Sequence, residues 1–242
     1  MEQFISVAAA VIATGFAVDL IVDFRRKPRP HTAAYAAGIS MFALASWALA
    51  AGLTLGWSGF SYRTFFLLGA ILNIPVLALG SMYLVIGKRA GTIMFICCGA
   101  IAAISTTLTT TVAFARPLPA GGIPHDIFPP ISEGFGPRLL AAIAGGTGAT
   151  ILILLAVISL FRFWRKNRRL VWGNALIVAG TLAASTGGTG LAIGEGTAFA
   201  LSLLLAAGLI WGGYRVATGA RAKAPSTVQN QHHDTGGNQH RR

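Results

Sequence analysis

Charged side chains are scarce in this chain of 242 residues, and their scarcity excludes a soluble globular protein. Only 11% of the residues are Asp, Glu, Lys or Arg, whereas 54% are hydrophobic. An average soluble domain carries about 25% charged residues. A soluble domain of this size exposes too much surface to hide so large an apolar fraction. The composition therefore indicates an integral membrane protein.

Residues on which membrane chemistry often depends are missing from the apolar runs. The four lysines, Lys27, Lys88, Lys166 and Lys223, lie between or after the runs, which excludes a retinal Schiff base. His31 lies at the edge of a run and the other histidines lie outside the runs, which disfavours a haem held by helical histidines. No HExxH, GxSxG or Walker loop occurs. We therefore expect a protein that is not an enzyme and has no cofactor and no metal site.

Cysteine is nearly absent, so the sequence carries no disulfide framework. Cys97 and Cys98 are adjacent within an apolar run. Neighbouring side chains on a helix project about 100° apart, which makes a bridge between them unfavourable. We interpret them as two small hydrophobic residues.

Long apolar runs dominate what is present. Each has between 17 and 24 residues, close to the roughly 20 residues that an α-helix needs to cross a bilayer. The runs predict an all-α fold, a polytopic bundle of seven transmembrane helices. They cover Phe4–Val22, Ala33–Leu55, Phe65–Ile86, Gly91–Phe114, Leu139–Phe161, Val171–Ile193 and Ala198–Tyr214.

The basic residues alternate between the two sides of these runs. Of the 19 Lys and Arg residues, 16 lie in the first, third and fifth connections and the tail, and three lie on the other side. Cytoplasmic loops of membrane proteins carry such an excess. We therefore expect an external N-terminus, a cytoplasmic C-terminus and a location in a bacterial plasma (inner) membrane. Because the net charge of +12 resides in short loops and the tail, we expect membrane lipids and no nucleic acid as partners.

Two segments outside the runs have distinctive compositions. The fourth connection, Ala115–Arg138, is long and rich in proline, which predicts an irregular but stiff external segment. It is either a connector or a lid over an external opening. Residues 216–242 form a polar, basic tail that cannot bury apolar area, so we expect a transmembrane domain over 1–215 followed by a disordered cytoplasmic tail.

Asp19 is the ionisable side chain within the runs, about one turn from the cytoplasmic end of the first helix. Ionisable residues inside membrane spans are costly and often functional. Asp19 can reach the interface or pair with Arg25 or Arg26, which would set the depth of the helix. A proton-relay role is the sharper alternative.

Asn73 and Pro75 interrupt the middle of the third run. Pro75 lacks an N–H and clashes with the carbonyl of Ile71, which predicts a kink. The freed carbonyl needs a partner, which Asn73 or a neighbouring helix can supply. The pair is either a substrate contact or hinge, or a packing feature of the bundle.

Hydroxyl side chains gather in the outer halves of the fourth, fifth and sixth predicted helices. Thr181, Ser185 and Thr189 recur every four residues and therefore share a helix face. Thr107 and Thr110 belong to a run of hydroxyls at the end of the fourth helix. Small and hydroxylated residues serve close helix packing. They also suit the wall of an outward-facing cavity for an uncharged ligand, and both interpretations stay open.

The segments FRRKPRPH and YRTFFLLGAILNIPVLALGSMYLV resemble a group of uncharacterised seven-helix integral membrane proteins of actinobacteria. The resemblance covers about residues 15–215. It implies the membrane bundle and brings no activity and no site residues with it.

Two functions follow as expectations from the runs and the polar residues. The first is a binder or transporter of a small neutral or amphiphilic molecule in the hydroxyl-lined cavity. The second is a structural, accessory or sensory membrane protein that transports nothing, in which small residues pack helices or contact a second copy or another membrane protein.

Overall fold

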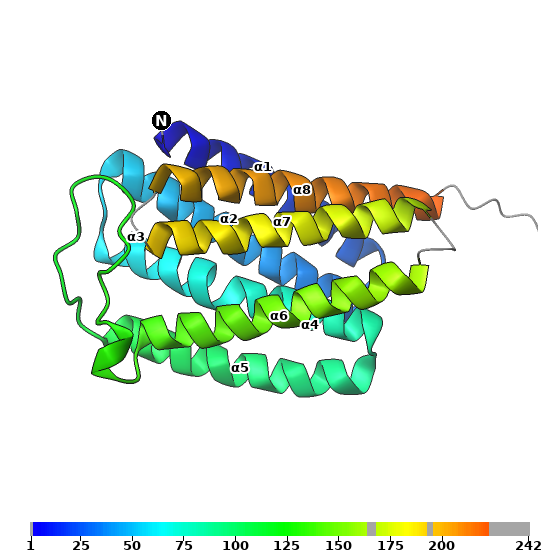
Figure 1. Cartoon of the computed structure of the whole chain (residues 1–242), viewed down its shortest axis with the longest axis horizontal. Helices are drawn as coiled ribbons and strands as arrows, with labels where there is room; N and C mark the ends of the chain where they lie inside the picture. The colour runs from blue at the N-terminus through cyan, green and yellow to red at the C-terminus, as the bar shows by residue number, and fades with distance from the viewer. Residues whose placement is uncertain (1, 164–167, 193–195, 223–242) are drawn as a thin grey trace, which may run out of the picture.

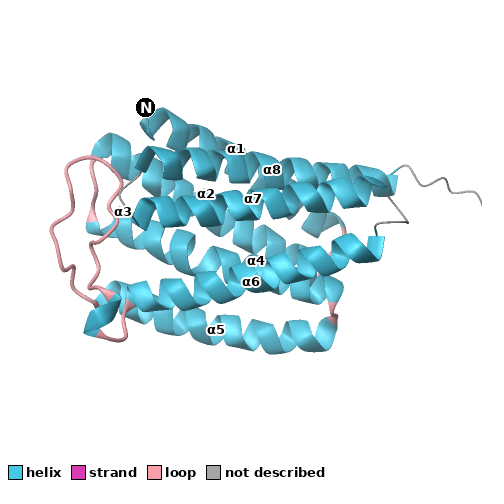
Figure 2. Cartoon of the chain, viewed as in Figure 1, coloured by secondary structure: helices cyan, strands magenta, loops and turns pink. Residues whose placement is uncertain are grey.

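The computed structural model describes residues 2–163, 168–192 and 196–222, which form helices joined by loops (Figures 1 and 2). Each of the seven predicted runs coincides with a helix. The segments α3, η1 and α4 join end to end into one long helix, Gly59–Val85. The elements are α1 Glu2–Arg26, α2 Pro30–Leu55, α3 Gly59–Thr64, the π-helical η1 Phe65–Leu72, α4 Asn73–Val85, α5 Lys88–Thr111, the short 3-10 turn η2 Ile131–Glu133, α6 Pro137–Phe163, α7 Arg168–Ala192 and α8 Gly196–Ala222.

Within the described chain, six helices are long and apolar enough to cross a membrane. They are α1, α2, the Gly59–Val85 helix, α5, α6 and α8. In α7 the apolar stretch Val171–Ala184 is shorter. The predicted all-α fold, with helices long and apolar enough to span a membrane, is thus confirmed.

Six helices close into a ring. Its order is α1, α2, the Gly59–Val85 helix, α6, α7 and α8, and α8 packs again on α1. The remaining helix, α5, packs against α4, η1 and α6. Only 17% of the apolar stretch of α5 is buried, against 56% for α2. Helix α5 therefore lies at the periphery of the bundle.

The two ends of the bundle differ in chemistry. One end, the loop end, holds the N-terminal turn of α1 and the long connection 112–136 (Figure 1). The opposite end, the basic end, holds the α1–α2 and α4–α5 connections and the last turns of α8. Exposed cationic side chains such as Arg25, Lys27 and Lys88 lie there. The described chain thus begins and finishes at opposite ends of the bundle.

The helix carrying Pro75 remains continuous through the proline, and the eight residues before Asn73 are π-helical. The Asn73 N–H donates to the Leu68 carbonyl, five residues back. Proline cannot donate an i→i−4 bond, and a wider helical turn is one way to absorb the missing donor. The sequence predicted a kink at Pro75. In the structure, the irregularity next to the proline is the π-helical segment Phe65–Leu72.

Two boundaries differ from the expectations. Helix α8 continues to Ala222, seven residues past the predicted end of the transmembrane domain at residue 215. The long connection is largely irregular, as predicted, but includes η2, and α6 begins at Pro137. The predicted disorder of the tail stays a prediction, since residues 223–242 lie outside the described ranges.

Candidate functional site

The predicted cavity wall on α5 faces away from the bundle. Thr107 and Thr110 are exposed on this peripheral helix. The Thr107 hydroxyl donates to the Ala103 carbonyl at 3.0 Å, and the Thr110 hydroxyl donates to the Thr106 carbonyl at 2.8 Å. Hydroxyls that bond back to their own helix need no other partner. These two residues therefore do not line an internal cavity.

Three hydroxyl residues of α7 were predicted to line the cavity, and one of them, Thr181, is buried. Its side chain is 9% exposed, and its hydroxyl donates to the Ile177 carbonyl at 2.9 Å. Thr181 lines the cavity described below. Ser185 and Thr189 lie on the same helix, but their side chains fall outside the described part of the chain.

Asn73 and Pro75 lie where the Gly59–Val85 helix packs on its neighbours. The Cys98 thiol of α5 lies 3.7 Å from the Pro75 carbonyl oxygen. A Cβ atom on Gly148 of α6 would lie 3.0 Å from the Pro75 nitrogen, so only glycine allows this approach without a shift. The Asn73 Oδ1 atom is buried and has no hydrogen-bond partner among the described residues. The two residues belong to a packed junction, and neither lines this cavity.

A partly open cavity of about 60 Å³ lies between α2, α4, α6 and α7. A buried water needs about 10–15 Å³ of such volume, so the cavity has room for a few waters or part of one small solute. Tyr35, in the first turns of α2, and Val85, the last residue of α4, place it toward the basic end. Its lining is Tyr35, Ser81, Leu84, Val85, Leu152, Ile153, Leu155, Ala156, Ser159, Ile177, Val178 and Thr181.

Four hydroxyl groups and no charged side chain line this cavity. They belong to Tyr35, Ser81, Ser159 and Thr181. The Tyr35 and Ser81 oxygens lie 2.9 Å apart and share a hydrogen bond between α2 and α4. Gly80 makes this crossing possible, because a Cβ there would lie 2.7 Å from the Tyr35 ring. The cavity offers hydrogen bonds within an otherwise apolar wall, which suits an uncharged ligand.

The sequence had indicated Thr181 and missed the other three hydroxyls. Tyr35, Ser81 and Ser159 are single polar residues on separate helices, so no spacing within one segment links them. The sequence had placed the hydroxyl-lined wall in the helix halves next to the long connection, whereas this cavity lies in the half next to the basic end.

Aromatic and aliphatic side chains pack together in the half of the bundle next to the loop end. We call this cluster the loop-end plug. Phe65 of η1 lies against Phe199 of α8, with ring centroids 6.1 Å apart, although these helices are not neighbours in the ring. The plug therefore crosses the ring interior. Its buried members are Leu49, Leu53, Trp57, Tyr62, Phe65, Ile123, Ile127, Phe128, Phe199, Ala200 and Leu203.

The long connection 112–136 supplies part of the plug. Phe128 is fully buried, and its ring centroid lies 5.0 Å from that of Phe66 and 5.5 Å from that of Tyr62. The Trp57 indole N–H donates to the Gly122 carbonyl at 2.8 Å. The connection thus inserts apolar side chains between the helices instead of only joining α5 to α6.

Arg63 joins the connection to α3 and α5. Its guanidinium donates to the carbonyls of Thr109 and Val112, the latter at 3.1 Å, at the C-terminal end of α5. A cation is favourable at the negative end of a helix dipole. The guanidinium carbon also lies 4.4 Å from the centroid of the Phe114 ring. One side chain therefore stabilises the end of α5 and the start of the connection together.

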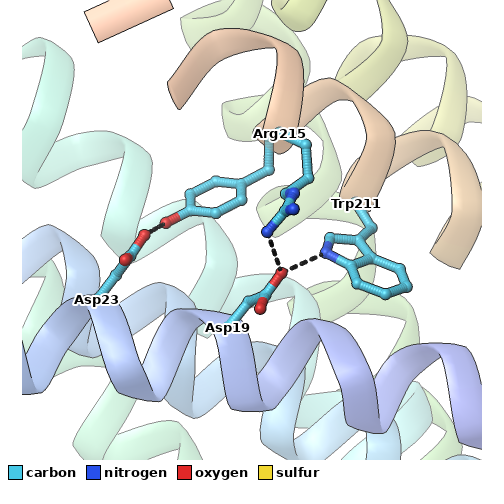
Figure 3. Close-up of polar contacts among 5 residues, drawn as sticks. Asp19, Asp23, Trp211 and Arg215 are labelled. Atoms are coloured by element: carbon cyan, nitrogen blue, oxygen red, sulfur yellow. Dashed lines mark hydrogen bonds and ion pairs between the residues drawn. The ribbon is translucent and has the colours of Figure 1, made fainter. Parts of the chain in front are cut away.

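At the basic end, acidic side chains of α1 bond to α8 (Figure 3). Asp19 accepts from the Trp211 indole at 2.9 Å and from Arg215 at 3.1 Å. Asp23, one turn further, accepts from the Tyr214 hydroxyl. The sequence had paired Asp19 with Arg25 or Arg26 of its own segment, but the cation that it meets comes from α8. Asp19 is therefore part of a contact between the first and last described helices.

No group of three or more His, Cys, Asp or Glu side chains within the described ranges is arranged to hold a metal ion. No protein-family model, curated protein or solved structure matches the chain.

Proposed function

We propose that the chain is a seven-span protein of a bacterial plasma membrane, with the loop end outside and the basic end in the cytoplasm. The concentration of Lys and Arg at the basic end supports this orientation. The opposite positions of the two ends of the described chain agree with an odd number of spans (Figure 1). Helix α7, which lies between α6 and α8 in the ring, is then the span that brings the six to seven.

Within this bundle, the cavity binds or carries a small neutral or amphiphilic molecule. The observation that carries the proposal is the set of four hydroxyls, without a charged side chain, that lines the ring interior. Uncharged lining groups can bind a hydroxyl, amide or ester while rejecting ions, which would lose their hydration without compensation. In this orientation the cavity lies in the cytoplasmic half of the bundle.

Native mass spectrometry of the gently solubilised protein tests this function. We expect a stoichiometric uncharged or amphiphilic molecule that is lost from the Ser81→Ala, Thr181→Val double variant. The matched control is Thr107→Val with Thr110→Val, which removes two hydroxyls from the exposed face of α5. A bound molecule retained by the cavity variant, or no bound molecule in any sample, would contradict stable binding in the cavity.

The peripheral position of α5 favours a second candidate function, an accessory or sensory role without transport. Ile93, Phe95 and Ile96 are exposed on α5, which offers an apolar face to a second copy or another membrane protein. A protein subunit that co-purifies in stoichiometric amount in the same experiment would favour this function.

A further inference from the structure

We infer that the loop-end plug is the outer gate of the hydroxyl-lined cavity, and that the Gly59–Val85 helix is the element that opens it. This inference rests on the proposed function, because a gate has meaning only if the cavity exchanges a ligand. The plug occupies the ring interior at the loop end, and the cavity occupies it toward the basic end. The molecule is therefore closed on one side of the cavity.

The closure depends on few polar contacts. Besides its apolar side chains, the connection is attached to the described bundle by the Trp57 bond to Gly122, by Arg63 and by a hydrogen bond between the Tyr62 hydroxyl and the backbone of Ile127. Arg63 lies on α3, so any movement of this first segment of the helix also moves the end of α5 and Phe114. These contacts couple the helix to the connection.

The helix is irregular directly below its plug residues. Tyr62, Arg63 and Phe65 lie at or before the start of the π-helical segment, and Pro75 lies just beyond its end. A π-helical segment can return to α-helical bonding by a register shift, which rotates the residues above it. Proline is the commonest site of a helix bend. The segment Phe65–Pro75 therefore has the properties of a hinge.

Unpaired polar atoms surround this hinge in the closed structure. Asn73 Oδ1, Ser105 Oγ and Thr109 Oγ1 are buried without a hydrogen-bond partner in the described part of the chain. Ser105 and Thr109 lie on α5, which packs against η1. A buried polar atom without a partner costs about 1–3 kcal/mol. An open arrangement that admits water to this interface relieves that cost, which lowers the energy difference between the two arrangements.

Thiol labelling measures opening of the plug directly. Ala200 is fully buried in the plug, and Ala200→Cys is a small change. The probe is made in a Cys97→Ser, Cys98→Ser background, in nanodiscs, and reacted with a membrane-impermeant charged maleimide. We expect Arg63→Gln to raise the labelling rate by about tenfold or more, because two charge-assisted hydrogen bonds are lost. Adding Pro75→Ala should return the rate toward that of the parent.

Controls separate gate opening from general loosening. Ala13→Cys, fully buried on α1, should stay unreactive in every background. Pro30→Ala, at the first residue of α2, should not restore the rate as Pro75→Ala does. Hydrogen exchange at the Ala115 amide, which donates to the Ile127 carbonyl at 2.8 Å, follows the same opening without a cysteine. The exchange of this amide should be faster in Arg63→Gln than in the parent, and the increase should be smaller in Arg63→Lys.

Equal labelling of Ala200→Cys with and without Arg63→Gln, or a parallel rise at Ala13→Cys, would overturn the gate. Neither measurement needs a ligand, so the gate and the proposed function fail separately. If the plug opens but the protein binds no small molecule, the opening movement is as inferred and the proposed binding function is wrong. If a small molecule binds but Ala200→Cys stays unreactive in all variants, the gate is wrong and the proposed binding function stands.

Discussion

Arg215 of α8 donates to the Asp19 carboxylate of α1 at 3.1 Å, across 196 positions of the sequence. At the other end of the same pair of helices, the Thr197 hydroxyl donates to the Glu2 carboxylate at 2.9 Å. Between these contacts, Phe16 of α1 stacks on Trp211 of α8 with ring centroids 6.4 Å apart. The first and last described helices are thus joined near both ends, and this closes the ring.

Asp19 should stabilise the ring mainly through its hydrogen bond to Trp211. The Arg215 side chain is 67% exposed, so the ion pair itself contributes less than about 1 kcal/mol. Asp19→Asn retains an acceptor and should cost little. Asp19→Ala leaves the indole N–H of Trp211 without its acceptor and should cost about 1–3 kcal/mol of unfolding free energy.

Unfolding by SDS in mixed micelles measures both Asp19 variants. Arg26→Gln, at an exposed residue of the same helix, is the matched control and should change the free energy of unfolding by less than about 0.5 kcal/mol. Equal stabilities of Asp19→Ala and the parent would show that the contact does not hold α1 on α8.

Gly148 should be intolerant of a side chain, while its neighbour Gly146 should accept one. A Cβ on Gly148 would lie 3.0 Å from the Pro75 nitrogen, whereas a Cβ on Gly146 meets no atom within 4 Å. Gly148→Ala should therefore lower the unfolding free energy by about 1–3 kcal/mol, the usual cost of overpacking. Gly146→Ala should be neutral or stabilise by up to about 1 kcal/mol, because alanine favours the helix.

The same SDS titration compares the two glycine variants. Equal effects of the two substitutions would mean that α6 does not approach the Gly59–Val85 helix as closely as the structure has it. A loss of stability confined to Gly146→Ala would contradict the packing altogether.

The positions of the helices could be predicted from the sequence because the signal is local. A run near 20 apolar residues, bounded by basic connections, identifies a helix without knowledge of its neighbours. The side of each helix that faces the core depends on those neighbours. Thr107 and Thr110 were expected on a cavity wall, but α5 lies outside the ring and presents them outward.

The cavity could be predicted only in part for the same reason. Thr181 belongs to a repeat on one helix, which sequence reasoning can recognise. Tyr35 and Ser81 are 46 positions apart and meet because α2 packs on α4 beside Gly80. Nothing in the surroundings of either residue in the sequence indicates that contact. The π-helical response to Pro75 is a tertiary effect as well, since close contacts with α5 and α6 surround the proline.

Trp57 should control the mobility of the long connection. Trp57→Phe keeps the aromatic ring in the plug and removes the hydrogen bond to the Gly122 carbonyl. We expect a loss of about 1 kcal/mol of local stability, equal to a several-fold faster amide exchange over 112–136. Trp172→Phe, on an exposed residue of α7, is the control and should leave this exchange unchanged. Unchanged exchange in Trp57→Phe would show that the apolar contacts alone hold the connection.

The Tyr35–Ser81 hydrogen bond should couple α2 to α4 energetically. Tyr35→Phe and Ser81→Ala each remove one partner and leave the other hydroxyl without its bond, whereas the double variant removes both. A double-mutant cycle should therefore give a coupling of about 0.5–1.5 kcal/mol, with the double variant more stable than the sum of the single losses predicts.

The control cycle for this bond combines Tyr35→Phe with Ser46→Ala. Ser46 is also a buried serine, but its hydroxyl donates to the Phe42 carbonyl of its own helix at 2.9 Å. The losses in this second cycle should add, because the two residues share no bond. Additive losses in the Tyr35–Ser81 cycle would instead mean that the cavity hydroxyls are independent. A ligand that bridged them would then meet two separate groups rather than one preformed pair.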